Sequence, residues 1–164
     1  MKLNDLDAII FDFDGVLTDD RVYVDQDGRE MVCCNRRDGL GFDVLRRTSL
    51  KLFILSTERN LVVSRRGEKL QVPVYQGSGN KVESLSKMSQ THGFELNRAL
   101  FVGNDLNDYD AMRACGFSVC PADSHPQICD IAGVVLKANG GAGVVRELVE
   151  DVLKLDMVSL FKKL

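Results

Sequence analysis

The strongest constraint on the fold is a series of short apolar runs, each followed by a segment with helical periodicity. Three of these runs are residues 7–13, 50–55 and 99–102. Each run is short and ends in polar or turn-forming residues, which is typical of a buried strand. Strands that alternate with helices predict a parallel sheet covered on both faces. The chain is therefore expected to have an α/β fold with a doubly wound parallel sheet.

The other expected elements complete this alternation. We predict helices at 39–48, 61–70, 80–92, about 107–114, 126–130 and 143–153, and further strands at 72–75, 117–119 and 134–136. We expect residues 1–164 to form one domain without a large cap domain, because no stretch remains for a second one.

Two segments lie outside the alternation. Residues 21–35 are predicted to form a β-hairpin, because Asp27-Gly28 is a strong turn signal between two β-prone segments. The C-terminal tail, about 155–164, is amphipathic. It is expected either to form a frayed helix or to dock on a neighbouring molecule.

Composition narrows the classes of partner and compartment. The net charge is −3, and no basic run is interleaved with aromatic residues, so nucleic acid binding is not expected. The sequence contains no run of 18 apolar residues, so no membrane span is expected. The N-terminus lacks the apolar core of a signal peptide. The five cysteines form no C-x-x-C pair and are expected to be free thiols. We therefore expect a cytoplasmic protein that binds no membrane.

Polar side chains collect where the predicted strands end. Asp12 and Asp14 follow the first strand, Ser56 follows the second, and Asp105 follows a later one. Ligands of open α/β sheets bind at these carboxyl ends. Residues two apart share one face of a strand, so Asp12 and Asp14 can face one cavity, with Gly15 allowing the chain to turn. Carboxylates that lie close together require a cation, and an oxygen-only site suits Mg²⁺.

A D-x-D pair alone also serves as a helix cap, but here it belongs to an ordered set of motifs. The set comprises D-x-D-G-x-x-T-D at 12–19, Ser56 after an apolar strand, Lys81 before a helix, and G-N-D-x-N-D at 103–108. In this order, and over nearly the whole chain, the motifs resemble those of the haloacid dehalogenase superfamily of phosphotransferases.

The resemblance implies a metal site and one departure from the family pattern. Mg²⁺ would be held by the Asp12 carboxylate, the Asp14 backbone carbonyl and Asp105, with Asp108 supporting the metal shell. Asn104 stands where the usual G-D-D-x-x-D motif has its first Asp. Because Asp105 and Asp108 remain, we expect metal binding to survive.

The resemblance also implies a phosphomonoesterase with four catalytic residues. Asp12 would attack phosphorus and form an aspartyl-phosphate. Asp14 would protonate the leaving oxygen and then activate water. Ser56 and Lys81 would bind the phosphoryl oxygens.

Within the superfamily, the chain resembles a capless group that acts on phosphorylated 2-keto-3-deoxy sugar acids. The hairpin after the first motif and the Gly-rich stretch 140–143 before Arg146 carry this likeness. The group includes octulosonate 8-phosphate phosphatases, nonulosonate 9-phosphate phosphatases and the phosphatase-like tail of animal sialic acid cytidylyltransferases. It implies a homotetramer in which hairpins meet at the centre and one subunit closes the site of its neighbour.

Departures near the second motif bear on the sugar acid. The octulosonate enzymes typically read T-G-R, but here Thr57 and Glu58 replace the Gly and the Arg. Glu58, with Lys69 further along, favours a nonulosonate 9-phosphate, and the octulosonate 8-phosphate comes next. Alternatively, Glu58 caps the helix start and Lys69 lies on the surface. Gly15 and Thr57 are also expected to contact substrate, and Arg146 is either a carboxylate ligand across the subunit interface or a surface charge.

Two other function classes stay open. One is a non-catalytic oligomerisation or regulatory domain, like the cytidylyltransferase tail, and the other is a phosphate-binding switch resembling a response regulator. The presence of Asp12, Asp14 and Lys81 favours catalysis over both. Asp38 is a further candidate at the rim of the pocket.

Overall fold

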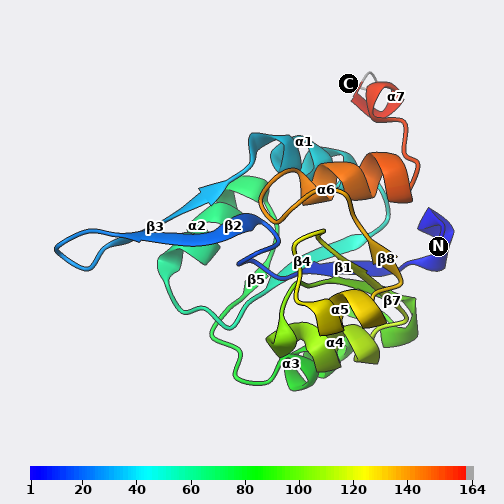
Figure 1. The fold of residues 1–164 in the computed structure, drawn as a ribbon. Helices are drawn as coiled ribbons and strands as arrows, with labels where there is room; N and C mark the ends of the chain where they lie inside the picture. Colours follow the sequence, from blue (N-terminus) through cyan, green and yellow to red (C-terminus); the bar gives the residue numbers. More distant parts are fainter. Residues whose placement is uncertain (162–164) are drawn as a thin grey trace.

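A six-stranded, all-parallel sheet forms the centre of the molecule (Figure 1). The structure is a computed structural model that describes residues 1–161. The strands run in the order β5-β4-β1-β6-β7-β8. They are β1 (Ala8–Phe11), β4 (Lys51–Leu55), β5 (Val74–Tyr75), β6 (Ala99–Val102), β7 (Phe117–Cys120) and β8 (Val134–Val135). The predicted doubly wound parallel sheet is confirmed.

Helices cover both faces of this sheet (Figure 1). They are α1 (Arg36–Leu45), α2 (Leu61–Leu70), α3 (Lys81–His92), α4 (Tyr109–Ala114), α5 (Pro126–Ile131), α6 (Val144–Glu147) and α7 (Met157–Phe161). Short 3-10 turns span Leu3–Asp5, Leu96–Arg98 and Leu106–Asp108. No helix of residues 1–161 is both long and apolar enough to span a membrane.

The apolar run of the central strand β1 is continuous because both faces of the strand are buried. Ile9 and Phe11 belong to the hydrophobic cluster on the face of α1, α2 and α6. Ala8 and Ile10 belong to a second cluster on the face of α3, α4 and α5. All four side chains are fully buried. A strand covered on both faces carries an unbroken apolar sequence, whereas a half-exposed strand alternates.

The hairpin projects from the body of the molecule as a separate two-stranded sheet (Figure 1). It consists of β2 (Thr18–Val24) and β3 (Glu30–Cys34), so it begins three residues earlier than the sequence predicts. Asp25 accepts hydrogen bonds from the backbone N–H groups of Asp27 and Arg29 at its tip, both at 2.9 Å. Gly28 has φ +77°, as the predicted turn requires. No cap domain is inserted within the described residues.

Local hydrogen bonds explain two further differences from the prediction. Helix α1 starts at Arg36 rather than Gly39, because the side chain of Asn35 caps it by accepting from the Arg37 N–H. The helix expected over 143–153 changes after Glu147 to a π-helical turn, Leu148–Val152.

The tail forms α7 and packs against its own chain. The carbonyl of Leu160 accepts a hydrogen bond from Arg47 at 2.6 Å, and Met157 joins the core. The end of the predicted amphipathic tail, residues 162–164, lies outside the described residues.

Asp38 has a structural position instead of the predicted one at the pocket rim. It lies buried on α1, where its Oδ1 accepts from the backbone N–H groups of Val145 (2.9 Å) and Arg146 (3.2 Å) at the start of α6. Its Oδ2 is buried and has no hydrogen-bond partner. Burial therefore raises the pKa of Asp38 to about 6, although the two backbone hydrogen bonds oppose this.

This raised pKa predicts how stability depends on pH. The protonated form of Asp38 is the one favoured in the folded state, so its contribution is complete below the ordinary pKa of 3.8 and is lost as the pH rises through about 6. Asp38→Asn keeps the acceptor oxygen and removes this titration. Urea unfolding in EDTA at pH 4 and pH 7.5 should show a decrease in unfolding free energy that is smaller in Asp38→Asn, by on the order of 2–3 kcal/mol. Equal decreases in the two proteins would contradict the assignment. Asp43→Asn, on the same helix, should behave like wild type.

Candidate active site

A cleft of about 270 Å³ opens at the carboxyl ends of β1, β4 and β6. Its lining brings together residues from three separate motifs, as the parallel topology predicts. The lining residues are Asp12, Asp14, Asp20, Ser56, Thr57, Asn104, Asp105, Leu106 and Asn107.

A buried lysine joins two carboxylates beside this cleft. The ammonium group of Lys81 lies 2.8 Å from Asp12 Oδ1 and 2.5 Å from Asp108 Oδ1, and all three side chains are nearly or fully buried. Lys81 is the first residue of α3, and Asn80 caps that helix by accepting from the Glu83 N–H. Asp12 follows β1 directly, and its N–H donates to the Val102 carbonyl of β6 at 2.9 Å. Two neighbouring strands and one helix start thus fix the relative positions of nucleophile candidate and cation.

The electrostatics of this group follow from burial and charge. Burial raises the pKa of Asp12 above its ordinary value, and the nearby Asp108 carboxylate adds to this, while Lys81 opposes both. Burial works to lower the pKa of Lys81, but the carboxylates of Asp12 and Asp108 outweigh it, so the pKa is raised and the lysine stays charged. A further cation beside Asp12 would favour its ionised, nucleophilic form.

Asp14 lines the cleft, and its pKa is shifted in the direction that acid-base catalysis favours. Its pKa is raised, first by burial and then by the charges of Glu58 and Asp20. Asp12 and Asp14 therefore face one cleft in different environments: Asp12 is paired with Lys81, while no salt bridge joins Asp14 to a cation among the described residues. This is the difference expected between a nucleophile and a general acid-base group.

Gly15 and Asn104 pack directly against each other. Gly15 has φ +72°, and a Cβ on it would lie 1.9 Å from Asn104 Nδ2, so only glycine fits there. Gly15 is buried and allows the tight turn that follows Asp14, and its contact with substrate stays a prediction. Asn104 lines the cleft, and its Oδ1 is buried without a hydrogen-bond partner.

The oxygen atoms around the cleft fit a hard divalent cation. Asp108 accepts from Lys81 on Oδ1 and from the Asn104 N–H on Oδ2 (2.9 Å), so it positions the loop and the lysine beside the cleft. Asp105 is exposed, and its Oδ1 accepts from the Leu106 N–H at 2.7 Å. No group of three His, Cys, Asp or Glu side chains in residues 1–161 is arranged to hold a metal.

The unpartnered Asn104 Oδ1 supplies the oxygen donor that carboxylates alone do not. Together with Asp12 and Asp14 on the same cleft, it gives a set of oxygen ligands of the kind that Mg²⁺ prefers. An orphaned buried acceptor of this kind is expected where a ligand completes the site. The three residues therefore fit the predicted cation, and Asp105 stays at the rim of the cleft as an additional candidate.

The second motif takes up its predicted place. Ser56 is buried at the end of β4, lines the cleft, and its Oγ accepts from the Glu58 N–H at 3.1 Å. Thr57 is exposed and lines both the cleft and an adjoining cavity that Lys81 also lines. A phosphoryl group bound at Asp12 would therefore have a hydroxyl group and an ammonium group nearby.

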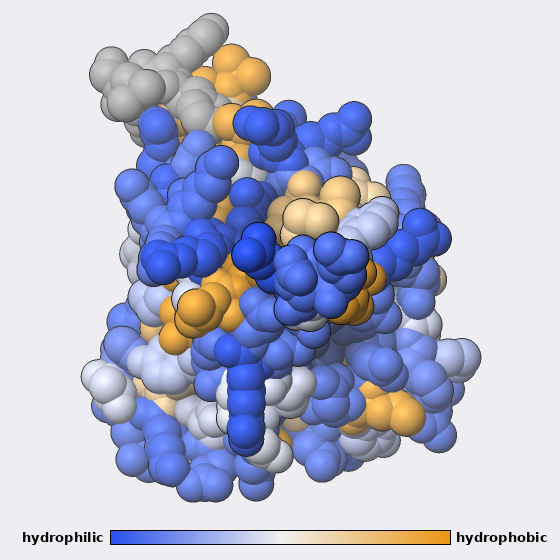
Figure 2. Space-filling view, turned by 90° about the vertical axis from the view of Figure 1, so that its left-hand side faces the viewer, coloured by the Kyte–Doolittle hydropathy of each residue, from blue (hydrophilic) through white to orange (hydrophobic). Residues whose placement is uncertain are grey.

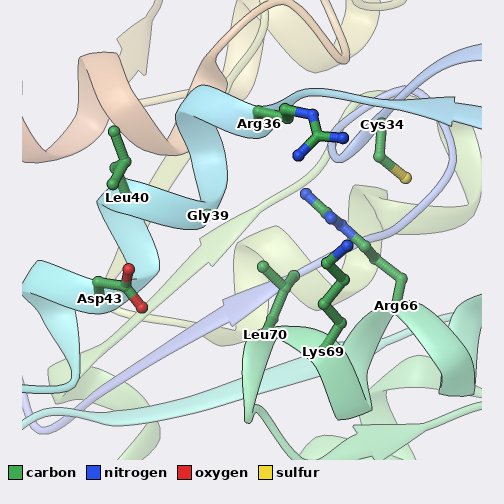
Figure 3. A pocket seen from close by; sticks show the side chains of 8 residues that line it. All are labelled: Cys34, Arg36, Gly39, Leu40, Asp43, Arg66, Lys69 and Leu70. Carbon is green, nitrogen blue, oxygen red and sulfur yellow. The ribbon is translucent and has the colours of Figure 1, made fainter.

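The predicted specificity residues Glu58, Lys69 and Arg146 do not line one common pocket in the folded chain. Glu58 lines a cavity of about 190 Å³ at the hairpin base, which Asp14 also lines. Its Oε1 accepts from the N–H groups of Arg59 (2.5 Å) and Asn60 (2.7 Å) in the turn before α2, whose cap is Asn60. Lys69 lines a different pocket, between α1 and α2 (Figure 3). Arg146 pairs with Glu150 at 2.7 Å on its own helical segment.

Four cleft residues were not among the predicted site residues. They are Asp20, Asn104, Leu106 and Asn107, and Asp20 also lines the cavity at the hairpin base. Asp20 adopts φ +62°, which turns the chain from the first motif into the hairpin. Its neighbour Asp19 is part of the quoted motif, so the second Asp of the T-D-D sequence was the available signal.

Comparisons with known proteins agree with this geometry. A family model described as haloacid dehalogenase-like hydrolase matches residues 50–148. A curated relative, the 3-deoxy-D-manno-octulosonate 8-phosphate phosphatase of Escherichia coli (strain K12), is 31% identical over 153 residues, which cover 93% of this chain and 81% of that protein.

Solved structures share the whole fold. A HAD family hydrolase from Streptomyces avermitilis has a TM-score of 0.89 at 41% identity and covers 92% of this chain and 86% of its own. The octulosonate 8-phosphate phosphatase of Moraxella catarrhalis, in complex with a magnesium ion, a phosphate ion and 3-deoxy-octulosonate (KDO), has a TM-score of 0.90 at 26% identity and covers 97% and 93%. The motif order, the cleft and these matches lead to one conclusion: the chain belongs to the haloacid dehalogenase-like hydrolases.

Proposed function

We propose that this hydrolase is a Mg²⁺-dependent phosphomonoesterase that acts on a phosphorylated 2-keto-3-deoxy sugar acid. The observation that carries the proposal is the buried Asp12 carboxylate, held by Lys81 at the cleft that Asp14 also lines. The relatives that are phosphatases of octulosonate 8-phosphate support the substrate class, and the magnesium ion in the Moraxella structure supports the cofactor.

The chemistry assigned to these residues proceeds in two steps. A carboxylate oxygen of Asp12 attacks phosphorus, the bond from phosphorus to the ester oxygen breaks, and that oxygen takes the proton of Asp14. Water then attacks the phosphorus of the aspartyl-phosphate and gives its proton to Asp14, which frees inorganic phosphate and restores Asp12. Lys81 and Ser56 bind phosphoryl oxygens in both steps. Bound by Asp12, Asp14 and Asn104, Mg²⁺ would add positive charge beside the same oxygens.

A non-catalytic role is disfavoured by the same geometry. A pure oligomerisation domain has no need to keep Lys81 and Asp12 ion-paired in the protein interior, because the desolvation of buried charges opposes folding. Such an arrangement is typical of sites that use the charges for chemistry.

The leaving group has a defined space next to Asp14. The cavity at the hairpin base is lined by Asp14, Arg21, Glu30 and Glu58, among others. Polar side chains of this kind suit the hydroxyl groups of a sugar acid. The relatives support octulosonate 8-phosphate as the substrate, while Glu58 in this cavity is the observation that favours a nonulosonate 9-phosphate.

Steady-state kinetics decide between the two substrates. We expect Mg²⁺-dependent phosphate release from both, since they share the keto-acid chain. If Glu58 selects the nonulosonate, Glu58→Arg should shift the ratio of kcat/KM values towards the octulosonate by roughly tenfold. A wild-type preference of tenfold or more for the octulosonate would end the nonulosonate interpretation and leave the phosphatase assignment intact. No phosphate release from either substrate would contradict the proposed function.

We further propose that the protein assembles as a homotetramer through its hairpin. Val22, Tyr23, Val24 and Met31 expose more than half of their surface there. Figure 2, which views the molecule from the hairpin side, shows apolar areas close to this projection within a hydrophilic surface. Clustered apolar side chains on a projecting element are typical of an interface. The expected cytoplasmic location stays a prediction.

Light scattering on the eluate of a size-exclusion column tests this assembly. The wild-type protein should have the mass of four chains, because the exposed apolar hairpin is expected to be covered by other subunits. Val24→Glu with Met31→Glu should shift it to smaller species, since buried charges oppose association. Arg29→Glu, at the polar tip, should stay tetrameric. A stable wild-type monomer would contradict the proposal.

A further inference from the structure

Two of the five cysteines lie side by side where helix α5 covers strand β7. Cys120 is the last residue of β7, and Cys129 lies on α5. Their sulfur atoms are 4.0 Å apart, and the Cys120 thiol is directed at the Cys129 sulfur. Both are free thiols, so the two side chains touch without a covalent bond. Neither of them lines the catalytic cleft.

Hydrogen bonds at both ends of α5 explain this approach. Ser118 and Cys120 are two residues apart on β7, so they share one face of the strand. Ser118 Oγ donates to the Ile131 carbonyl at 3.3 Å, which holds the end of α5 on that face. At the other end, the His125 N–H donates to the Asn104 carbonyl at 2.9 Å. The helix is thus held across β7, with its thiol over Cys120.

The two thiols differ in their access to solvent. Cys120 is completely buried, and this burial raises the pKa of its thiol to about 12. Cys129 is only partly buried, and its thiol donates to the Ser124 carbonyl at 3.7 Å. An oxidant in solvent therefore reaches Cys129 first. A partly exposed thiol beside a second thiol is the arrangement in which the second one resolves the oxidised first one.

We propose that Cys120 and Cys129 are the site of a reversible disulfide that ties α5 to β7 and forms when a hydroperoxide reacts with the protein. The sulfur atoms must approach from 4.0 Å to about 2 Å, the length of an S–S bond. A rotation of the Cys129 side chain with a small displacement of α5 covers this difference, because α5 has only six residues.

The reaction takes two steps and consumes one hydroperoxide. The Cys129 sulfur, as a thiolate, attacks a peroxide oxygen, the O–O bond breaks, and the products are a sulfenic acid on Cys129 and an alcohol or water. The Cys120 sulfur then attacks the Cys129 sulfur, the S–O bond breaks, and the leaving hydroxide takes the Cys120 proton to form water. The two thiols lose two electrons, which reduce the peroxide. A thiol reductant converts the disulfide back to two thiols.

The other cysteines provide controls within the same chain. Cys33 is exposed on the hairpin, so the oxidant reaches it without a route to Cys120. Cys115 is buried, and its burial raises the pKa of its thiol to about 12, as at Cys120. Exposure alone and burial alone are therefore each represented by a thiol outside the pair.

Peptide mapping of the oxidised full chain tests the proposal. The reduced protein, in EDTA, is treated with hydrogen peroxide, and the remaining thiols are alkylated after unfolding. Trypsin, with a protease that cleaves before Asp, releases Cys120 in peptide 114–122 and Cys129 in peptide 123–129. Mass spectrometry should find these two peptides joined, and a reductant should separate them.

Variants assign the bond to the two sulfur atoms. Cys129→Ser keeps a hydrogen-bond donor for the Ser124 carbonyl, and should leave Cys120 reduced and open to alkylation after unfolding. Cys115→Ala makes Cys120 the only thiol of its peptide and should form the same cross-link as wild type. Cys33→Ser should also form it, because the hairpin takes no part.

Hydrogen exchange measures what the bond does to the fold. Amides of short helices exchange through local opening, which a cross-link to β7 opposes. The Ala132 N–H, directly after α5, donates to the Ile128 carbonyl at 3.0 Å. It should exchange roughly tenfold more slowly in the oxidised protein than in the reduced one. The amides of α2, on the other face of the sheet, should exchange equally in both.

Either of two results would overturn the proposal. One is oxidation of the wild-type protein at Cys33, or between chains, while peptides 114–122 and 123–129 stay separate. The other is a cross-link that leaves the exchange of α5 unchanged, because the bond would then not tie the helix to the strand. Neither measurement uses turnover, so their failure and that of the phosphatase assignment are distinguishable.

Discussion

Asp12→Asn should lower the rate of phosphate release by more than ~10³-fold, with substrate binding largely kept. The amide is a poor nucleophile, and Asp108, the other carboxylate paired with Lys81, does not line the cleft. The substitution keeps the size of the side chain, so the fold should be retained. Initial rates at saturating substrate, with Mg²⁺ and with EDTA, measure the effect.

Asp27→Asn is the control for this result. Asp27 lies at the exposed hairpin tip, and its side chain is not part of the cleft lining. Its activity should equal that of wild type. If Asp12→Asn retained wild-type activity, the assignment of the nucleophile would be wrong.

Lys81→Met should reduce both activity and stability. The change leaves Asp12 and Asp108 buried without their cation, and breaking a buried ion pair in this way destabilises a protein by about 3–5 kcal/mol. It also removes positive charge from the phosphoryl oxygens, so kcat should decrease by roughly 10²–10³-fold. Urea unfolding and steady-state kinetics measure the two effects separately.

Lys87→Met is the matched control on the same helix. Lys87 pairs with Glu83 at 2.6 Å, but both side chains are more than half exposed. Exposed pairs of this kind contribute about 0.5 kcal/mol or less, so stability and activity should hardly change. Similar losses in the two lysine variants would show that α3, and not the buried ion pairs, accounts for the effect.

The fold follows from the sequence because each strand carries a strong local signal. The run before Asp12 is apolar throughout, and the sheet buries it on both faces. Helix α2 was predicted with its observed limits, Leu61–Leu70, since Asn60 caps its start and its apolar face is regular. Boundaries failed where a cap decided them, as at Asn35, because a cap bond depends on backbone geometry that periodicity does not describe.

The candidate site was predicted only in part, for a physical reason. Residues directly after strands, such as Asp12 and Ser56, are placed by the sheet itself, so strand ends in the sequence locate them. Asp108 lies on a turn after β6, and its role depends on hydrogen bonds to Lys81 and the Asn104 N–H, which the motif does not reveal. The hydrogen bonds that Asp108 accepts were therefore not visible in the sequence, and its support of the metal shell stays a prediction.

Residues beyond the strand ends were harder to assign than those directly after a strand. Glu58 lies in the turn before α2 and Lys69 lies on α2, yet they line different pockets. Asp38 looked like a rim residue and instead caps α6, more than a hundred residues away in the chain. Which side of a helix faces which pocket depends on tertiary packing, and a single sequence contains little information about it.

Trapping the covalent intermediate tests the central claim most directly. Enzyme mixed with octulosonate 8-phosphate or nonulosonate 9-phosphate and Mg²⁺ is quenched in acid during turnover, and its peptides are analysed by mass spectrometry. The account predicts a phosphoryl group on Asp12 in wild type and none in Asp12→Asn. Turnover with the phosphoryl group on another residue, or with none on the protein at any quench time, would contradict it.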